Sequence, residues 1–273
     1  MIANKQHDSQ FHALHADGLL MLPNCWDAGS ARLAAASGAR ALATSSAAVA
    51  WSHGYADGGQ LPADLLLSTV SGIQRRSDLP LSIDIEDGYS DDPERVAALI
   101  GAVIDVGAVG INIEDGAQTP ELLCRKIAAV RRVADQRGVK LFINARCDVF
   151  LRQLLEPQQR VQETTRRAQL YRDAGANGLF APFISAEDEI RALAAATPLP
   201  LNVLALPGLP TPQRLLELGV RRLSAGSALS ESMFACVQQS MQHFMRSGAP
   251  YAADLPKLDY GQLNGLMQDG GNS

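Results

Sequence analysis

Short apolar segments recur along the chain, and each is followed by a segment with the periodicity of a helix. The apolar segments are rich in Val, Ile and Leu and are mostly continuous instead of alternating, as expected of parallel strands covered on both faces. Eight strands are predicted, at 19–24, 39–45, 79–85, 109–114, 140–146, 178–183, 199–205 and 221–226. Eight strands that alternate with helices predict an α/β protein with a (β/α)8 TIM-type barrel. The alternative, an open doubly wound sheet, normally has a glycine-rich phosphate turn, and the sequence contains neither G-x-G-x-x-G nor G-x-x-x-x-G-K.

Proline and glycine residues mark the ends of the predicted helices. Proline favours the first turn of a helix, and glycine favours the position just after its last turn. Helices are therefore predicted at 93–107, 119–138 (with Thr119 as N-cap) and 158–176, together with an N-terminal helix at about 5–16 and a C-terminal helical extension at about 229–268. A length of 273 residues is ordinary for one barrel, so we expect a single (β/α)8 domain over residues 1–273.

Composition and charge exclude several classes of protein. Hydrophobic residues make up 47% of the chain, which is ample for a core and excludes a disordered protein. The net charge is −5 and no long basic run occurs, so we expect no nucleic-acid partner. The N-terminus is polar and no apolar stretch approaches the roughly 20 residues of a membrane span, so we expect no membrane partner. The cysteines lack C-x-x-C spacing and are read as reduced thiols of a cytoplasmic protein: Cys25, Cys124, Cys147 and Cys236.

The carboxyl ends of the predicted strands carry polar residues, and in a TIM-type barrel the chemistry lies at these ends. Carboxylates that follow the adjacent third and fourth strands are the oxygen ligands that Mg²⁺ prefers. Asp91 and Asp92 precede Pro93 and can instead begin a helix. The polar residues at or near strand ends are Ser45, Ser46, Asp84, Glu86, Glu114, Asp115, Arg146, Asp148, Asn202 and Ser224.

An arginine and a long connection complete the predicted site. Arg146 follows a buried strand and needs an anionic partner, either a substrate carboxylate or an internal ion pair with Glu114 or Asp148. The connection "SSAAVAWSHGYADGG" (45–59) is rich in small residues, so its backbone N–H groups can approach a substrate carboxylate while Asp57 moves over the mouth. His53 in this connection is either an acid–base group or, as the simpler alternative, a solvated loop histidine.

Four segments resemble motifs of the isocitrate lyase/phosphoenolpyruvate mutase superfamily. They are "SSAAVAWSHGYADG", "DIEDGY", "GAVGINIEDG" and "NARCD", in this order, and the resemblance extends over residues 20–150. It implies a (β/α)8 barrel that depends on Mg²⁺, with Mn²⁺ as the alternative ion, and that makes or breaks a bond to C3 of pyruvate through an enolate. The implied partner is a small-molecule 2-keto or 2-hydroxy carboxylic acid.

The resemblance also implies roles for individual residues. Asp84 matches the direct metal ligand, and Glu86 and Glu114 match acids that hold the metal mostly through water. The implied substrate-binding residues are Ser45, Ser46, Ala47 and Arg146, and the implied catalytic residues are Asp57, Glu114 and Arg146. Asn202 is added to the substrate-binding set because it stands at the end of the seventh predicted strand.

Two departures from the superfamily pattern bear on the reaction. Its lyases carry a lysine–cysteine–glycine–histidine loop after "IED", whereas "EDGAQTPELLCRK" runs straight into a helix, where Cys124 is expected to pack. Its mutases carry a lysine in that loop and a histidine near the end of strand six, where Pro182 stands here. We therefore expect a Mg²⁺-dependent lyase that cleaves a C–C bond next to a 2-keto or 2-hydroxy acid, either a carboxylic acid lyase or an oxaloacetate-type decarboxylase. The alternatives are a C–P bond enzyme similar to phosphoenolpyruvate mutase or phosphonopyruvate hydrolase, and a non-catalytic barrel that binds a keto acid.

The last long helix carries an apolar stripe that has two interpretations. It either seals the barrel as an ordinary eighth helix or, as the resemblance implies, is swapped between subunits of a homo-oligomer, a dimer or tetramer. The stripe consists of Leu229, Met233, Phe234, Val237, Met241, Phe244 and Met245.

Overall fold

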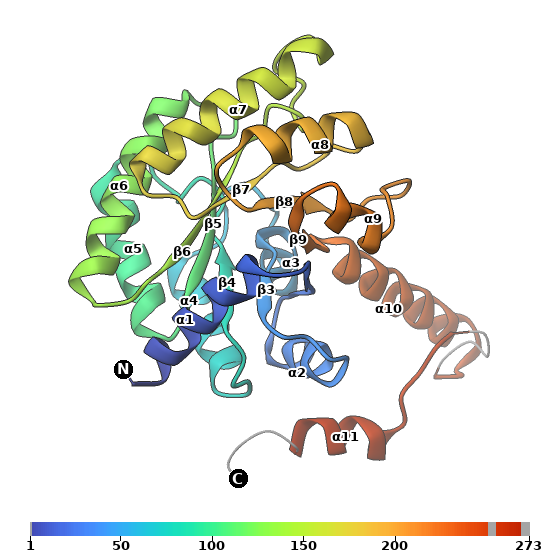
Figure 1. The fold of residues 1–273 in the computed structure, drawn as a ribbon. Helices are drawn as coiled ribbons and strands as arrows, with labels where there is room; N and C mark the ends of the chain where they lie inside the picture. Colours follow the sequence, from blue (N-terminus) through green and yellow to red (C-terminus); the bar gives the residue numbers. More distant parts are fainter. Residues whose placement is uncertain (1, 251–254, 269–273) are drawn as a thin grey trace.

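Nine parallel strands form a nearly closed barrel in the computed structural model, which describes residues 2–250 and 255–268. The strand order is β1-β9-β8-β7-β6-β5-β4-β3-β2, where β1 is Leu20–Leu22 and β2 is Asn24–Cys25. Only Pro23 separates these two, and because β1 pairs with β9 while β2 pairs with β3, they act as one interrupted barrel strand. Proline has no N–H to donate to a ladder, which accounts for the interruption. The predicted (β/α)8 TIM-type barrel is confirmed (Figure 1).

The predicted strands agree with the observed ones to within a few residues. The remaining strands are β3 (Leu42–Thr44), β4 (Leu81–Asp84), β5 (Gly110–Glu114), β6 (Phe142–Arg146), β7 (Gly178–Phe180), β8 (Leu201–Leu204) and β9 (Val220–Ser224). Their apolar side chains are buried, except for the half-buried Leu204 and Leu223, as continuous apolar runs predict for strands covered on both faces.

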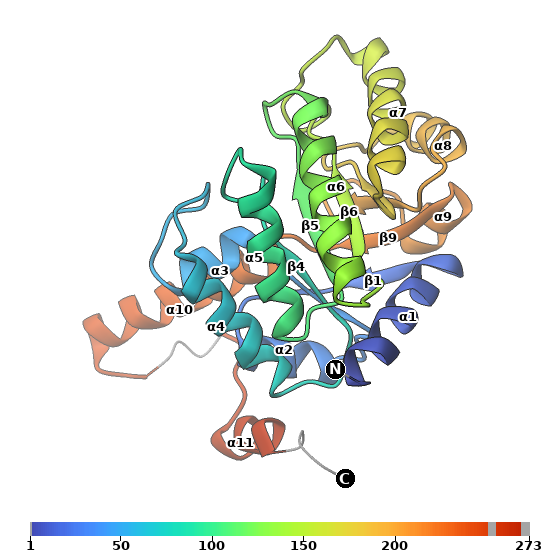
Figure 2. The same cartoon turned by 90° about the vertical axis from the view of Figure 1, so that its left-hand side faces the viewer.

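Helices pack around most of this barrel, and the two C-terminal ones extend from it (Figure 2). They are α1 (Ile2–Ala16), α2 (Ala28–Ala36), α3 (Ser46–Ser52), α4 (Ala63–Gln74), α5 (Pro93–Asp105), α6 (Pro120–Gln136), α7 (Pro157–Ala174), α8 (Glu187–Ala196), α9 (Pro212–Glu217), α10 (Ala228–Ser247) and α11 (Tyr260–Gln268). Proline occupies the first turn of α5, α6, α7 and α9, as its fixed φ favours. Thr119 does stand at the N-cap of α6, but its side chain makes no capping hydrogen bond. No helix in the described part of the chain is long and apolar enough to span a membrane.

Helix α1 packs across the amino-terminal end of the barrel. Phe11 of α1 is fully buried and meets Phe142 of β6 edge to face, and the His15 ring stacks on the same Phe142 at a centroid distance of 4.0 Å. Burial lowers the pKa of His15 to about 3, so this imidazole is neutral and serves packing.

The interior of the barrel contains a layer of amides below the carboxyl ends of the strands. The Asn144 side-chain amide donates to the side-chain oxygens of Asn112 (2.9 Å) and Asn202 (3.0 Å). Asn202 in turn donates to Ser224 Oγ (3.1 Å), and Arg222 donates to Asn112 (3.2 Å). These bonds join four strands across the barrel axis.

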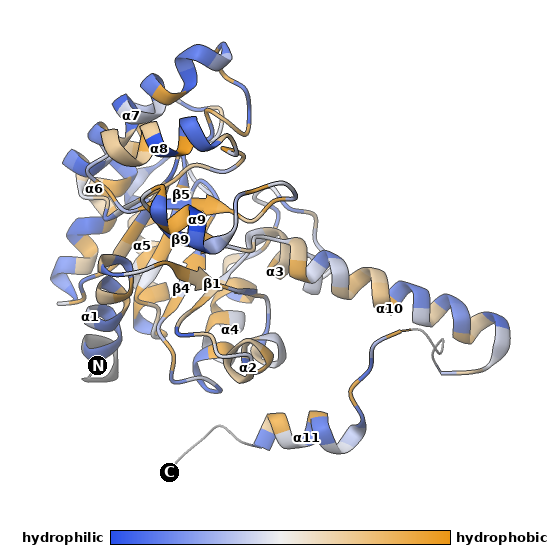
Figure 3. Ribbon diagram, turned by 45° about the vertical axis from the view of Figure 1, so that its right-hand side comes forward, coloured by the Kyte–Doolittle hydropathy of each residue, from blue (hydrophilic) through white to orange (hydrophobic). Residues whose placement is uncertain are grey.

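Helix α10 leaves the barrel instead of covering it. It extends away from the strands, and α11 returns to lie beside α2 (Figures 1 and 3). The backbone oxygens of Leu266 and Met267 in α11 accept hydrogen bonds from Arg32 and Arg76. The predicted C-terminal extension thus comprises two helices, and its residues 251–254 lie outside the described residues.

Candidate active site

Acidic side chains from the ends of two neighbouring strands form the centre of the site. Asp84 is the last residue of β4 and Glu114 the last of β5, and these strands pair directly. The backbone N–H of Asp84 donates to Thr44 Oγ1 of β3 (2.9 Å), and Asp84 Oδ1 accepts from the Glu86 N–H (3.1 Å). This last hydrogen bond ties the backbone of the third acid, Glu86, to the Asp84 side chain two residues earlier.

These carboxyl groups are buried close to one another, and their pKa values reflect it. Burial raises the pKa of Asp84, although the Arg146 guanidinium opposes the shift. Burial raises the pKa of Glu86 to about 7, and the Asp57 carboxylate adds to the rise. Burial raises the pKa of Glu114 to about 8 against the opposing charge of Arg146. A cluster of this kind is stabilised when a cation binds it.

The donor set fits a hard divalent cation held partly through water. Only oxygen atoms are offered, which suits Mg²⁺ and excludes the sulfur and imidazole sites that favour softer metals. Within residues 2–250 and 255–268, no three His, Cys, Asp or Glu side chains converge as direct ligands of one ion. Mg²⁺ usually retains several water molecules, so Asp84, Glu86 and Glu114 could hold it without all three being direct ligands.

Arg146, the last residue of β6, pairs with acids on both sides. Its Nη1 lies 2.6 Å from Glu114 Oε2, and its Nε and Nη2 donate to the two Asp148 oxygens at 2.6 and 3.0 Å. Both internal ion pairs considered from the sequence are present. The bidentate bond to Asp148 fixes the plane of the guanidinium, which presents Nη1 to Glu114.

Asp115 lies on the outer, helix-facing side of the barrel, although the sequence analysis includes it among the polar residues at the strand ends. Its carboxylate accepts from the Asp148 N–H (2.8 Å), from Arg167 Nη1 (2.7 Å) and from Tyr171 Oη (2.5 Å). Successive residues of a strand point to opposite faces, so Asp115 turns toward α7 while Glu114 turns inward. Arg167 and Tyr171, absent from the predicted site, are recognisable in hindsight as large polar residues one helical turn apart.

The connection after β3 differs from the prediction because part of it is helical. Residues 46–52 form α3, and alanines in this segment favour a helix. Ser45 is its N-cap, and the backbone of Ser46 makes a hydrogen bond to Asp84. Farther along, the Gly59 N–H donates to Glu86 Oε2 (2.6 Å). The predicted carboxylate cradle and the segment that carries Asp57 therefore both lie beside the acids.

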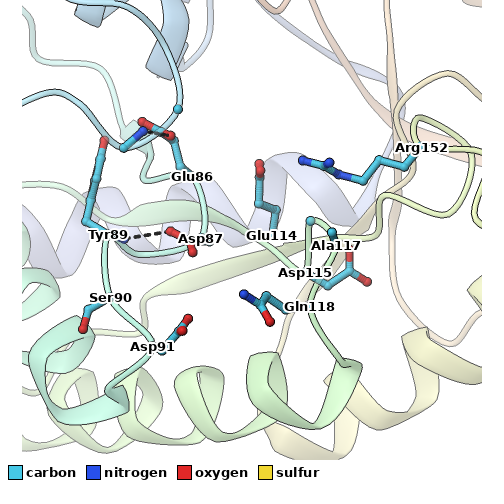
Figure 4. A pocket seen from close by; sticks show the side chains of 13 residues that line it. Glu86, Asp87, Tyr89, Ser90, Asp91, Glu114, Asp115, Ala117, Gln118 and Arg152 are labelled. Carbon is cyan, nitrogen blue, oxygen red and sulfur yellow. Dashed lines mark hydrogen bonds between the residues drawn. The ribbon is translucent and has the colours of Figure 1, made fainter.

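A cavity of about 460 Å³ opens next to the acids (Figure 4). Glu86 reaches it from the turn after β4, Glu114 from the end of β5, and the Arg152 guanidinium extends toward Glu114. The short connection between β5 and α6 contributes Gly116, Ala117 and Gln118 to the lining. The cavity is large enough for a small carboxylic acid.

Of the predicted metal-binding, substrate-binding and catalytic residues, only Glu86 and Glu114 line this cavity. Asp84, Arg146, Ser45, Ser46, Ala47 and Asp57 are not among its lining residues. Three further residues considered from the sequence also lie outside it. Asn202 is buried in the interior amide layer, so its substrate role stays a prediction. His53 is exposed, and its Nε2 lies 2.8 Å from Thr69 Oγ1 on α4. Cys124 packs against the core as expected, and burial raises the pKa of its thiol.

Asp91 and Asp92, both in the turn between β4 and α5, have different contacts. Asp92 is the N-cap of α5 and accepts from the Glu94 N–H (3.0 Å), as predicted. Asp91 lies 3.7 Å from Nζ of Lys126, a buried residue of α6 that the sequence analysis missed. The available signal was its position on the apolar stripe of α6, between Leu123 and Val130 at helical spacing.

Comparisons with known proteins agree with the fold. A sequence model described as phosphoenolpyruvate phosphomutase matches residues 11–245. The uncharacterized protein Rv1998c of Mycobacterium tuberculosis (strain H37Rv) is 38% identical over 223 residues, which are 80% of this chain and 81% of that protein. A crystal structure from Burkholderia cenocepacia J2315, provisionally described as a phosphonomutase, is 41% identical with a TM-score of 0.80, covering 86% of this chain and 100% of that one.

More distant relatives have named reactions. The 2-methylisocitrate lyase of Bacillus subtilis (strain 168) is 26% identical over 73% of this chain and 69% of that enzyme. An oxaloacetate decarboxylase of Bradyrhizobium sp. (strain BTAi1) is 28% identical over 56% of this chain and 53% of that enzyme. A solved phosphonopyruvate hydrolase complex with oxalate and Mg²⁺ shares the fold, with 22% identity and a TM-score of 0.82 over 96% of this chain and 95% of that one. The chain belongs to the phosphoenolpyruvate phosphomutase family, within the isocitrate lyase/phosphoenolpyruvate mutase superfamily.

Proposed function

We propose that the protein is a Mg²⁺-dependent lyase that cleaves a C–C bond adjacent to a 2-keto or 2-hydroxy acid through a pyruvate-type enolate. The observation that carries this proposal is the convergence of Asp84, Glu86 and Glu114 beside Arg146 at the carboxyl ends of β4, β5 and β6. When bound, Mg²⁺ supplies Lewis-acid stabilisation of negative charge on the substrate oxygen. The named reactions of two relatives, a 2-methylisocitrate lyase and an oxaloacetate decarboxylase, support cleavage of this type.

The residues around the acids have complementary tasks. Arg146 presents a fixed positive charge where negative charge develops, and such a preorganised charge is most effective in a buried site. Ser45 and the backbone of Ser46 and Ala47 form the cradle for the substrate carboxylate. Asp57, in the segment tied to Glu86 through Gly59, is the mobile acid that moves a proton at C3 of the product.

Cleavage of a C–P bond is the second candidate, because the matching family model is a phosphomutase and a relative is described as a phosphonomutase. Two features favour C–C cleavage. The connection after β5 is short, with neither the lysine nor the cysteine of the usual loop, and Pro182 follows β7 where the mutases carry a histidine. A decarboxylase or simple lyase needs only metal, enolate stabilisation and a proton source.

The test is pyruvate release by the purified protein, with Mg²⁺ and with a chelator. The substrates are oxaloacetate, 2-hydroxy acids of the isocitrate and malate type with and without methyl branches, and phosphonopyruvate. The 2-hydroxy acids without a 2-methyl group would release glyoxylate in place of pyruvate, so glyoxylate is assayed as well. Mg²⁺-dependent pyruvate from one carbon substrate is the expected result. Release from phosphonopyruvate alone would establish C–P cleavage in its place. No product from any substrate, checked by NMR to include isomerisation to phosphoenolpyruvate, would leave a barrel that binds a keto acid without catalysis.

We also propose that the protein is a homo-oligomer in which α10 packs on a second copy. An apolar groove of about 380 Å³ lies over β1 and β9, where an eighth helix would cover a closed barrel. Met21 of β1 is 56% exposed in this groove, and α10 presents its own exposed apolar residues, Met241 and Phe244 among them. Exchange of α10 between copies would cover both surfaces.

We further propose a reducing compartment, the cytoplasm, as the place of action. All four cysteines are free thiols, and two of them, Cys25 and Cys147, are fully buried. Unpaired cysteines persist where the cell keeps thiols reduced.

A further inference from the structure

Lys126 is a buried lysine with a defined set of partners. It lies on the core-facing stripe of α6, and only 2% of its side chain is exposed. Its Nζ donates to the backbone oxygen of Asp87 (2.8 Å) and lies 3.7 Å from carboxylate oxygens of both Asp87 and Asp91. A buried ammonium group is tolerated only where oxygen atoms compensate its charge. All three of these oxygens belong to the turn between β4 and α5.

This turn has an unfavourable backbone. Glu86 and Tyr89 have φ values of 52° and 60°, and Gly88 between them has 96°. Positive φ values are costly for residues other than glycine and persist only where surrounding contacts enforce them. At Gly88 a side chain would not fit, because a Cβ would lie 2.8 Å from both methyl groups of Val96.

The enforced conformation determines where Glu86 points. The Glu86 backbone oxygen accepts from the Glu114 N–H (2.9 Å), while its side chain faces the Gly59 N–H and lies close enough to Asp84 and Asp57 for their charges to raise its pKa. If the turn relaxed toward ordinary φ values, the Glu86 carboxylate would leave this group of acids. Lys126 is anchored in α6 and holds the turn from its other side, one residue after Glu86.

We propose that Lys126 is a positioning residue that holds the β4–α5 turn so that Glu86 faces the metal, and that it thereby sets the affinity for Mg²⁺ without contacting metal or substrate. The proposal rests on the proposed function, because it requires Glu86 to serve the metal. A positioning role and a purely electrostatic role of Lys126 predict opposite changes in Mg²⁺ affinity when the lysine is removed. Removing a positive charge near a cation site should strengthen cation binding if charge alone matters, whereas loss of the positioning contact should weaken it.

The test is Mg²⁺ binding to Lys126→Met, measured by isothermal titration calorimetry and compared with the unmodified protein. Methionine fills a similar volume, and the carboxylates left behind are 40% and 69% exposed, so water can solvate them and the fold should persist. We expect Mg²⁺ affinity to fall about 10- to 100-fold, as is usual when a residue behind a metal ligand is removed. At saturating Mg²⁺, kcat should return to within a few-fold of the unmodified value.

Arg132→Gln is the matched control. Arg132 also lies on α6 and pairs with Glu94 of α5, but both side chains are mostly exposed and neither belongs to the turn. Its Mg²⁺ affinity should be unchanged. If Lys126→Met does not fold, Lys126→Gln, which retains an N–H donor, should show a smaller weakening in the same direction. Mg²⁺ affinity that is unchanged or stronger in the Lys126 variants would overturn the positioning role alone, whereas failure of the unmodified protein to bind Mg²⁺ would overturn the proposed function as well.

Discussion

Asp84 is a buried acid, and a buried negative charge is unfavourable unless a cation or hydrogen bonds compensate it. Its carboxyl group sits at the end of β4, where burial raises its pKa. Removing such a group relieves a desolvation cost but leaves the Glu86 and Ser46 N–H groups without this acceptor, so the Tm of a substituted protein has to be measured beside its activity.

We expect Asp84→Ala to abolish Mg²⁺ binding and to lower kcat by about 100-fold or more, which corresponds to ~2.7 kcal/mol of transition-state stabilisation. Calorimetric titration with Mg²⁺ and a pyruvate assay measure the two effects. Asp78→Ala is the control, because Asp78 is an exposed acid just before the opposite end of β4. Unchanged activity of Asp84→Ala would remove the metal site from this position.

The raised pKa values of Glu86 and Glu114 predict how stability depends on pH. The raised pKa values, about 7 and about 8, lie above the ordinary value of 4.5. At any pH between 4.5 and the raised pKa of a group, that group binds more protons in the folded protein than in the unfolded chain. The free energy of unfolding of the metal-free protein should therefore fall as pH rises from about 6.5 to 8.5. The lowered pKa of His15 acts in the opposite sense, but only below its ordinary value of 6.5.

Mg²⁺ should counter this loss, because it binds the ionised carboxylates. We expect the increase in Tm on adding Mg²⁺ to be larger at pH 8.5 than at pH 6.5, as measured by differential scanning calorimetry. In Glu114→Gln the metal-free Tm should depend less on pH. A metal-free Tm that is flat or rises across this range would show that the acids are not clustered as described.

At the scale of the element, the turn between β4 and α5 is the least ordinary part of the barrel. Gly88→Ala places a methyl group against Val96 at a φ of 96°. We expect a loss of about 2 kcal/mol or more in the free energy of unfolding, from backbone strain plus the clash. Urea denaturation measures it, and Mg²⁺ affinity should fall as well because the turn carries Glu86.

Gly138→Ala separates the two contributions. Gly138 follows α6 with a φ of 66°, but a Cβ there meets nothing within 4 Å. It should cost about 1 kcal/mol, the strain of a left-handed residue alone, and leave Mg²⁺ binding unchanged. Equal losses at the two glycines would mean that Val96 moves aside and that the turn is not tightly held.

The sequence predicted those elements that local patterns determine. Continuous apolar runs located the strands, and prolines located the starts of α5 and α6. Helix α3 lies in a segment that the sequence predicts as a connection, because the nearby glycines favour a loop whereas its alanines favour a helix. The break at Pro23 was also missed, since the apolar run continues through it although proline cannot donate to the ladder.

The site was predictable only where the positions of its residues follow from the order of the strands. Topology brings strand ends together, so the neighbouring positions of Asp84, Glu114 and Arg146 followed from the fold class alone. The contact of Lys126 with Asp87 joins residues 39 positions apart through a helix and a turn of specific conformation. No local pattern encodes such a contact, although a lysine on an apolar stripe indicates that some buried partner exists.

At the scale of the whole molecule, two apolar surfaces remain open in one copy of the chain. One is the groove over β1 and β9, where Met21 and Leu223 lie. The other is the stripe along α10, which includes Val237, Met241 and Phe244. Large exposed apolar surfaces are unfavourable in water and usually mark an interface. Helix α10 follows β9 in the chain yet extends away from it (Figure 3). A second copy is therefore the occupant that we propose for both surfaces.

This arrangement predicts the behaviour of variants on either surface. Val237→Asp combined with Met241→Asp should dissociate the oligomer by placing two charges in the interface, and Met21→Asp should do so from the groove. Gln239→Asp, on the opposite side of α10 by helical spacing, is the matched control and should leave the assembly intact. Sedimentation velocity at micromolar concentration measures the assembly, with the unmodified protein expected as a dimer or tetramer. An unmodified protein that sediments as a monomer would contradict the exchange of α10. Dissociation by the α10 variants alone, with Met21→Asp still assembled, would show that α10 pairs with a surface other than the groove.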